Sequence, residues 1–249
     1  MKKTVLASLL CVSLMFTACS GEPSVIAAEE TAQSAETAET ATVTETEAEA
    51  PEVNRNELFE DMQSGKSFCF IGDSITAGTA TDGIPWYQPL EGFIQGEITN
   101  VSEPGWTSVH LTQLDGMIPC ADVYVIAIGI NDVLYIDQPL GAASSDEFIS
   151  NLDILAGMLR TLSPGAKMYF IAPWPFLNFP DEAYATRDEF TDALYAWCDG
   201  EERICIDPGS TILDVLEDVD VSVYMWNDYH PDTPQGVNLY SYAVLRPAS

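Results

Sequence analysis

The sequence predicts an α/β domain, a three-layer α/β/α sandwich around a mostly parallel sheet. Short, almost continuously apolar runs alternate with longer segments whose apolar residues recur at helical spacing. Strands that are apolar on both faces are typical of parallel sheets covered by helices on each side. Residues 56–249 also have the length of one such domain, so we expect the domain to span them.

Five strands are expected along the chain. The strongest pattern is ADVYVIAIGI, which is apolar almost throughout and rich in Val and Ile. A short apolar run that stops at Gly72 predicts a buried first strand. The expected strands are residues 67–71, 97–102, 121–130, 167–172 and 203–206.

Helices are expected between and after these strands. Thr107 or Ser108 can cap a helix running to about Met117, and Ser145 can cap the helix that Pro164 and Gly165 end. That second helix places its apolar side chains on one face. Helical spacing also favours residues 85–95, 181–197 and 235–245.

The first 19 residues are typical of a signal peptide. Lys2 and Lys3 precede a short apolar run, which is too short to span a bilayer of ~30 Å. The run ends in FTAC, which resembles the bacterial lipobox, although Phe16 stands where Leu is usual. The resemblance implies that Cys19 is lipidated and anchors the chain to the outer face of the bacterial cytoplasmic membrane. The alternative is an ordinary secretory signal cleaved near Ala18.

Residues 20–55 are expected to be a disordered acidic tether. Most of this segment is Ala, Thr and Glu, and residues 27–53 contain no aromatic residue, Lys or Arg. Such a segment has too little apolar surface to offset its ordering entropy, and its carboxylates repel one another. An Ala/Glu-rich helix is the alternative, but Lys partners at helical spacing are missing.

The charge excludes some partner classes. Nine Lys and Arg stand against 39 Asp and Glu, giving a formal net charge of −30. Phosphate backbones and anionic lipids repel such a protein, so we expect no nucleic acid partner and membrane contact through the lipid anchor only. We expect a monomer.

Cysteine and histidine usage argues against a metal site. The chain has two histidines, His110 and His230, and no CxxC pair, so no structural zinc site and no cofactor is expected. Cys198 and Cys205 flank a short turn, and we leave open whether they pair in an oxidising compartment.

Four short blocks follow predicted strands or precede the last helix. They are GDSIT at 72–76, an isolated Gly105, GIND at 129–132, and NDYHP at 227–231. Catalytic and binding groups of parallel sheets gather at the carboxyl ends of the strands. The blocks are therefore expected to meet at one edge.

In this order, the four blocks resemble the SGNH/GDSL hydrolase family over roughly residues 67–245. The resemblance implies a flavodoxin-like sheet and a serine ester hydrolase. It assigns Ser74 as nucleophile and His230 as general base, because a serine hydroxyl needs a neighbouring base to accept its proton. It assigns the oxyanion hole to the backbone N–H groups of Ser74 and Gly105 and the Asn131 amide.

One position departs from the family pattern. The family places an aspartate three residues before the histidine, and here that residue is Asn227. Asn227 can serve as a neutral orienter, Asp228 can reach the imidazole instead, or the enzyme can work as a Ser-His dyad. We lean to Asp228 because its charge stabilises an imidazolium.

The substrate is less well defined by the sequence. Trp106 and Trp174 follow strand ends and are candidate substrate-binding residues, although loop aromatics also serve local packing. An anchored protein of this kind resembles carbohydrate esterases that remove acetyl groups. We therefore expect an extracellular esterase for short acyl esters on a glycan. A non-catalytic glycan-binding lipoprotein and an acyltransferase are the alternatives.

Overall fold

The computed structural model describes residues 57–136, 140–198 and 200–246. Within them, five strands form one fully parallel sheet in the order β2-β1-β3-β4-β5. This is the flavodoxin-like strand order, and the predicted fold class is confirmed. The strands are β1 (Phe68–Gly72), β2 (Ile98–Ser102), β3 (Val123–Ala127), β4 (Lys167–Ile171) and β5 (Arg203–Ile206). The predictions on residues 1–55, with the lipidated Cys19, lie outside the described residues.

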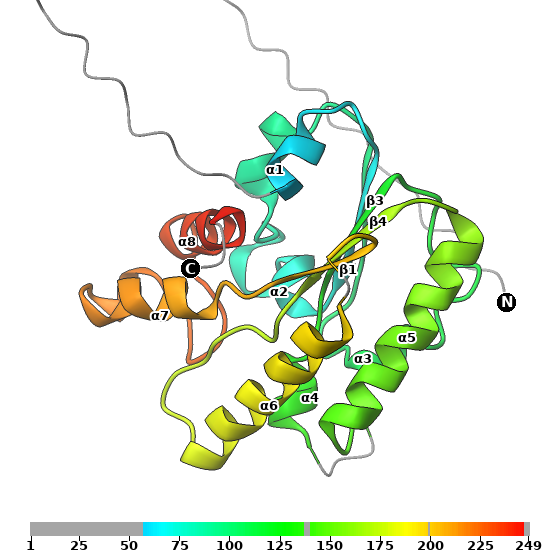
Figure 1. Ribbon diagram of the computed structural model, residues 1–249. Helices are drawn as coiled ribbons and strands as arrows, with labels where there is room; N and C mark the ends of the chain where they lie inside the picture. Colours follow the sequence, from blue (N-terminus) through cyan, green and yellow to red (C-terminus); the bar gives the residue numbers. More distant parts are fainter. Residues whose placement is uncertain (1–56, 137–139, 199, 247–249) are drawn as a thin grey trace, which may run out of the picture. The chain divides into compact units, whose positions relative to one another are not determined.

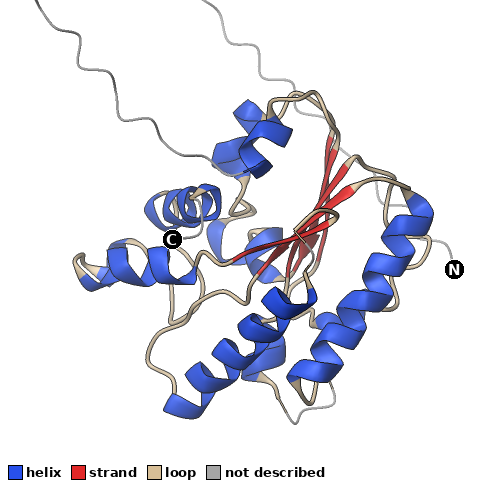
Figure 2. Cartoon of the chain, viewed as in Figure 1, coloured by secondary structure: helices blue, strands red, loops and turns tan. Residues whose placement is uncertain are grey.

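Helices cover both faces of the sheet (Figures 1 and 2). Figure 1 shows α5 on one side of the strands, and α8 and α1 on the other. The described helices are α1 (Glu57–Met62), α2 (Ser74–Ala77), α3 (Ser108–Leu111), α4 (Ile130–Leu134), α5 (Ser145–Leu162), α6 (Asp181–Trp197), α7 (Gly209–Glu217) and α8 (Gln235–Leu245), with the 3₁₀ helices η1 (Thr79–Thr81), η2 (Gln88–Phe93) and η3 (Val221–Val223).

Strand β1 lies between β2 and β3, and the chain changes direction there. It first crosses to β2 at the edge and then returns past β1 to form β3. Such a reversal opens a crevice at the carboxyl ends of the two central strands. Gly72 closes β1 beside Ala127 of β3, and a side chain at Gly72 would lie 2.5 Å from the Ala127 carbonyl oxygen. Only glycine fits this approach.

An aromatic cluster packs η2 and α8 against the sheet. Phe70 of β1 stacks on Tyr87 with ring centroids 3.7 Å apart, and Trp86 meets Trp174 edge to face at 5.5 Å. Trp174 in turn packs on Tyr240 of α8 at 4.8 Å. All five rings are buried. The last helix is thereby tied to the first strand.

The helical segments differ from prediction in several places, and α5 is capped by Ser144 rather than Ser145. Residues 85–95 contain the 3₁₀ helix η2 instead of an α-helix. Helix α3 ends at Leu111 rather than near Met117, and Gly116 adopts a left-handed turn conformation. The short helices α1, α4 and α7 were not predicted.

The thiols of Cys198 and Cys205 are both free. Cys198 follows α6 and Cys205 lies in β5, and the two side chains hydrogen-bond to each other. That hydrogen bond and burial raise the pKa of the Cys205 thiol.

Candidate active site

Ser74 begins the short helix α2, directly after strand β1. The side chain of Asp73 caps this helix by accepting a hydrogen bond from the Ile75 backbone N–H at 3.0 Å. At the other end the N–H of Gly78, which is in the left-handed conformation, donates to the Ser74 carbonyl. The turn is thus fixed at both ends, and Ser74 is held at the strand end.

His230 lies in the loop before α8, and backbone hydrogen bonds close that loop on itself. The Trp226 N–H donates to the His230 carbonyl at 3.0 Å, and the Asp232 N–H donates to the Tyr224 carbonyl at 2.7 Å. His230 is 9% exposed, and this burial lowers its pKa below the ordinary histidine value.

The structure brings Ser74 and His230 together. Ser74 Oγ lies 2.8 Å from His230 Nε2, although the two residues are 156 positions apart. This is within the distance over which a base can take a serine proton.

Asn227 contacts Nδ1, the imidazole nitrogen that faces away from Ser74. The preference for Asp228 as the residue that orients His230 is therefore wrong. Asn227 Nδ2 lies 3.0 Å from His230 Nδ1. The Asp228 carboxylate instead accepts a hydrogen bond from Asn178 at 2.8 Å, and the Asp228 carbonyl accepts one from the Leu177 N–H. These two contacts hold Asp228 away from the ring.

Gly105 and Asn131 line the same pocket as Ser74 and His230, a hollow of about 390 Å³. Gly105 has a positive φ of 79°, and Asn131 Nδ2 donates to the Trp106 carbonyl at 2.8 Å. Among the described residues, the backbone N–H groups of Ser74 and Gly105 donate to no other protein group. These donors remain available to a negatively charged oxygen in the pocket.

Two buried aspartates support the loops around this pocket. Asp132, on α4, accepts hydrogen bonds from the Ser108 N–H and hydroxyl and from the Ala142 N–H. Asp73 is fully buried, and its Oδ2 has no hydrogen-bond partner. Burial raises the pKa of Asp73 to about 7. The loop-organising role expected of both residues agrees with these contacts.

The aromatic residues at the pocket are not those that the sequence suggested. Trp174 is buried in the core, and Trp106 stacks on His110 outside the pocket lining. Trp226, Tyr135 and Tyr229 line the pocket instead, with Trp226 61% exposed. Trp226 directly precedes Asn227, and its place beside the histidine block was the signal that could have found it.

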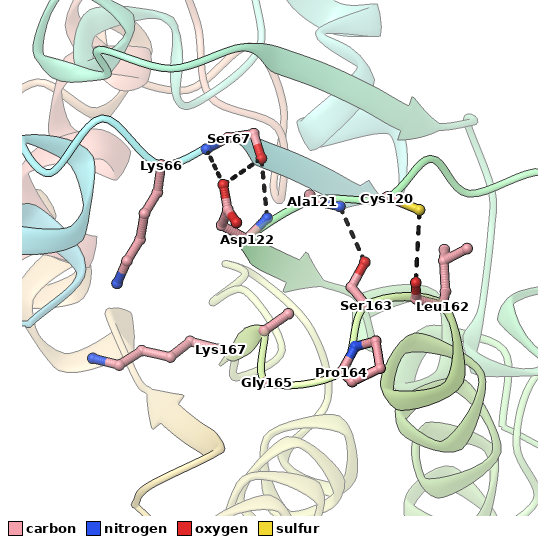
Figure 3. A pocket seen from close by; sticks show the side chains of 11 residues that line it. Lys66, Ser67, Cys120, Ala121, Asp122, Leu162, Ser163, Pro164, Gly165 and Lys167 are labelled. Carbon is pink, nitrogen blue, oxygen red and sulfur yellow. Dashed lines mark hydrogen bonds between the residues drawn. The ribbon is translucent and has the colours of Figure 1, made fainter.

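A second pocket, of about 470 Å³, lies at the amino-terminal ends of strands β1, β3 and β4 (Figure 3). Its polar groups hold strands together: the Ser67 N–H and hydroxyl donate to Asp122 at 2.9 and 2.7 Å. The amines of Lys66 and Lys167 lie on one side of the pocket and pair with Asp61. These serine, lysine and aspartate side chains are thus already paired with one another. They lie at the end of the sheet away from Ser74.

The described part of the chain contains neither a candidate metal site nor a candidate membrane span. No group of three or more His, Cys, Asp or Glu side chains there is arranged to hold a metal ion. None of the helices described has the length and apolar character needed to cross a membrane.

Comparison with known proteins identifies the family. The sequence model of the GDSL-like lipase/acylhydrolase family matches residues 70–234. The chain belongs to this family. A GDSL-like hydrolase is a serine ester hydrolase, and the match includes Ser74, Gly105, Asn131 and His230. No curated protein matches the chain.

Solved structures share the fold of this GDSL-like hydrolase. The acetylxylan esterase Axe2 of Geobacillus stearothermophilus is 21% identical, with a TM-score of 0.61 over 74% of this chain and 94% of that one. A candidate GDSL-like lipase from Parabacteroides merdae is 18% identical, with a TM-score of 0.61 over 73% and 94% of the two chains. A hydrolase from the metagenome of Lake Arreo, Spain, is 21% identical, with a TM-score of 0.56 over 72% and 93%.

The buried Asp73 makes the stability of this hydrolase depend on pH. Its pKa of about 7 in the folded chain exceeds the unfolded value of about 3.9. The folded state therefore binds the proton more tightly. Between these pH values the carboxyl ionises in the unfolded chain but stays protonated in the fold, so the free energy of unfolding falls as pH rises. We expect Asp73→Asn, which cannot ionise and can still cap α2, to gain free energy of unfolding relative to wild type over this range. The steepest gain is about 1.4 kcal/mol per pH unit.

Urea unfolding at several pH values measures this difference. Asp122→Asn is the matched control, because Asp122 is exposed and its hydrogen bonds from Ser67 lower its pKa. The control should show no such gain. A difference between Asp73→Asn and wild type that is constant from pH 4 to 8 would mean that Asp73 keeps an ordinary pKa.

Proposed function

We propose that this pocket is the active site of an exported esterase that hydrolyses short acyl esters, in particular acetyl esters on carbohydrate. The observation that carries the proposal is the 2.8 Å contact between Ser74 Oγ and His230 Nε2, in a pocket that also contains Gly105 and Asn131. A nucleophile, a base and oxyanion donors around one hollow are what acyl transfer requires.

The reaction has two halves. Ser74 Oγ attacks the ester carbonyl carbon while its proton passes to His230 Nε2, and the alcohol departs with that proton as its bond to the acyl carbon breaks. Water then attacks the acyl-serine, with His230 taking a proton from the water and returning it to Ser74 as the acid leaves. Both halves depend on an Nε2 that can accept a proton.

The negative charge of each tetrahedral intermediate falls on the former carbonyl oxygen. The free backbone N–H groups of Ser74 and Gly105 and the amide of Asn131 can donate to it. Removing one such donor typically costs about 2.7–4 kcal/mol of transition-state stabilisation. Gly105 has a positive φ, a backbone conformation that favours glycine at this point of the pocket.

Exposed aromatic rings at the pocket favour a carbohydrate substrate. Trp226 is 61% exposed and Tyr135 is 46% exposed, and both line the pocket. Flat rings beside a nucleophile offer an apolar face to a sugar ring. Axe2, which shares the fold, is described as an acetylxylan esterase. Asp82 at the pocket disfavours polyanionic substrates.

The Ser74→Ala variant tests the assignment of the nucleophile. We expect its hydrolysis of p-nitrophenyl acetate to fall to the uncatalysed background, because Ser74 Oγ is the hydroxyl that contacts His230 Nε2 at 2.8 Å. A fluorophosphonate probe should label the wild type and leave the variant unlabelled. Unfolding by urea checks that the fold is retained. A variant with wild-type turnover would refute the proposal, and an unlabelled wild type that binds glycans would favour the non-catalytic alternative.

The Trp226→Ala variant tests the sugar platform. A ring-stacking contact is worth about 0.5–1.5 kcal/mol, so KM for an acetylated xylo-oligosaccharide should rise roughly 2- to 13-fold. Turnover of p-nitrophenyl acetate, which has no sugar, should change little. Tyr242→Ala removes an exposed aromatic that is not part of the pocket lining and is the control. Equal losses on both substrates would argue against stacking on a sugar.

The Cys19→Ala variant tests the location. We propose that Cys19 carries the lipid that anchors the protein outside the cell, on the strength of the FTAC sequence after the apolar run. In bacterial cells the wild type should label with radioactive palmitate and sediment with membranes. The variant should lose the label and leave the membrane fraction. Unchanged labelling would contradict the proposal.

A further inference from the structure

The side chain of Asn227 has its orientation fixed by the backbone of its own loop. Asn227 Oδ1 accepts hydrogen bonds from the Tyr229 N–H at 3.0 Å and from the His230 N–H at 2.7 Å. A backbone N–H only donates, so the end of the amide that faces these two groups must be the oxygen. The NH₂ end therefore faces the imidazole and cannot be exchanged with the oxygen without facing two other donors.

This orientation determines which nitrogen of His230 carries the proton. Asn227 Nδ2 lies 3.0 Å from His230 Nδ1, and an NH₂ group has no lone pair to offer. Nδ1 must therefore accept, and the single proton of the neutral ring is on Nε2. At 2.8 Å from Ser74 Oγ, that Nε2–H donates to the serine oxygen. The base then has no lone pair facing the hydroxyl from which it must take a proton.

We propose that Asn227 is a positioning residue that holds His230 in the tautomer protonated at Nε2, so that hydrolysis is held back until the ring exchanges its proton. This inference rests on the proposed function of Ser74 and His230. In the reactive tautomer Nδ1 carries the proton and points it at the NH₂ group of Asn227. Two donors then face each other, or the amide turns away from the two backbone N–H groups. Either arrangement makes the reactive tautomer a minor state.

The same geometry acts on the charged form of the ring. The imidazolium that forms during the reaction has a proton on both nitrogens, and Asn227 presents an N–H to one of them. The other titratable groups that line the pocket are Asp82, Tyr135 and Tyr229. Asp228, in the same loop, is bound to Asn178. The group on Nδ1 is therefore a neutral donor where an acceptor would stabilise the imidazolium.

Replacing Asn227 with aspartate changes this single feature. Aspartate has the same shape, and one of its oxygens can keep the two backbone hydrogen bonds that close the loop. Its other oxygen can accept from Nδ1–H, which leaves the Nε2 lone pair facing Ser74. In a serine protease the opposite change, aspartate to asparagine, lowers kcat about 10⁴-fold through the wrong tautomer. A purely structural role for Asn227 predicts no gain from this substitution.

The experiment measures kcat for p-nitrophenyl acetate with the full chain and its Asn227→Asp variant. We expect kcat to rise at least about 100-fold. This is a small part of the roughly 10⁴-fold effect that the reverse change has in a serine protease triad. The acid limb of the pH profile should also move to higher pH, because a carboxylate on Nδ1 raises the pKa of His230. Asp228→Asn, a carboxylate-to-amide change at the next residue, is the control and should alter neither.

Nitrogen-15 NMR of histidine-labelled protein reads the tautomer directly and needs no variant. The chain holds two histidines, so a His110→Gln variant assigns the signals. In wild type near pH 8 we expect an unprotonated Nδ1 and a protonated Nε2 for His230, and the reverse in Asn227→Asp. A protonated Nδ1 in the wild type would overturn the proposal.

The outcomes separate this proposal from the proposed function. If the tautomer is as expected but Asn227→Asp is no faster than wild type, the tautomer does not limit hydrolysis and the proposal fails. If Ser74→Ala retains the turnover of its parent in both the wild-type and Asn227→Asp backgrounds, the esterase assignment fails, whatever the NMR shows. A fast Asn227→Asp variant that Ser74→Ala silences supports both.

Discussion

The hydrogen bond between Ser74 and His230 joins the end of the first strand to the loop before the last helix, 156 positions later. It can form only if α8 is docked against the same side of the sheet as α2. The Ser241 hydroxyl donates to the Trp86 carbonyl, and Tyr240 packs on Trp174. At the start of α8, a side chain on Gly236 would lie 1.9 Å from the Tyr224 carbonyl oxygen. The packing of one helix therefore determines whether the site exists.

The opposite side of the pocket depends on buried polar groups. Asp132 gathers hydrogen bonds from Ser108 and Ala142, and the Asn151 amide of α5 donates to the Ser108 hydroxyl at 3.0 Å. These contacts tie the segment after Gly105 to the helix that carries Asn131. Burying a carboxylate is costly unless it is well hydrogen-bonded, and Asp132 is. Asp73 differs in having one oxygen without a hydrogen-bond partner, and burial raises its pKa to about 7.

The sequence predicted the strands, the sheet class and the four blocks of the site, because these depend on local apolar patterns and on strand ends. Helices α6 and α8 and strand β5 begin and end where the pattern placed them. The aromatic residues of the pocket were harder to predict, because the sequence does not show that Trp226 is exposed and Trp174 is buried when both lie in loops. The choice of Asp228 as the residue that orients His230 was based on its charge and was wrong. The backbone turn of the loop places Asn227 against His230 Nδ1 and places the Asp228 carboxylate against Asn178. Such a choice depends on backbone geometry, which one sequence does not display.

Asn227 has two tasks in this loop, and they place different demands on its side chain. Its oxygen closes the loop by accepting from two backbone N–H groups, and aspartate would do this equally well. Its nitrogen faces the imidazole, where aspartate and asparagine act in opposite ways. Loop closure alone therefore does not explain the amide. At the imidazole the two side chains differ, because asparagine donates to Nδ1 whereas aspartate would accept from it.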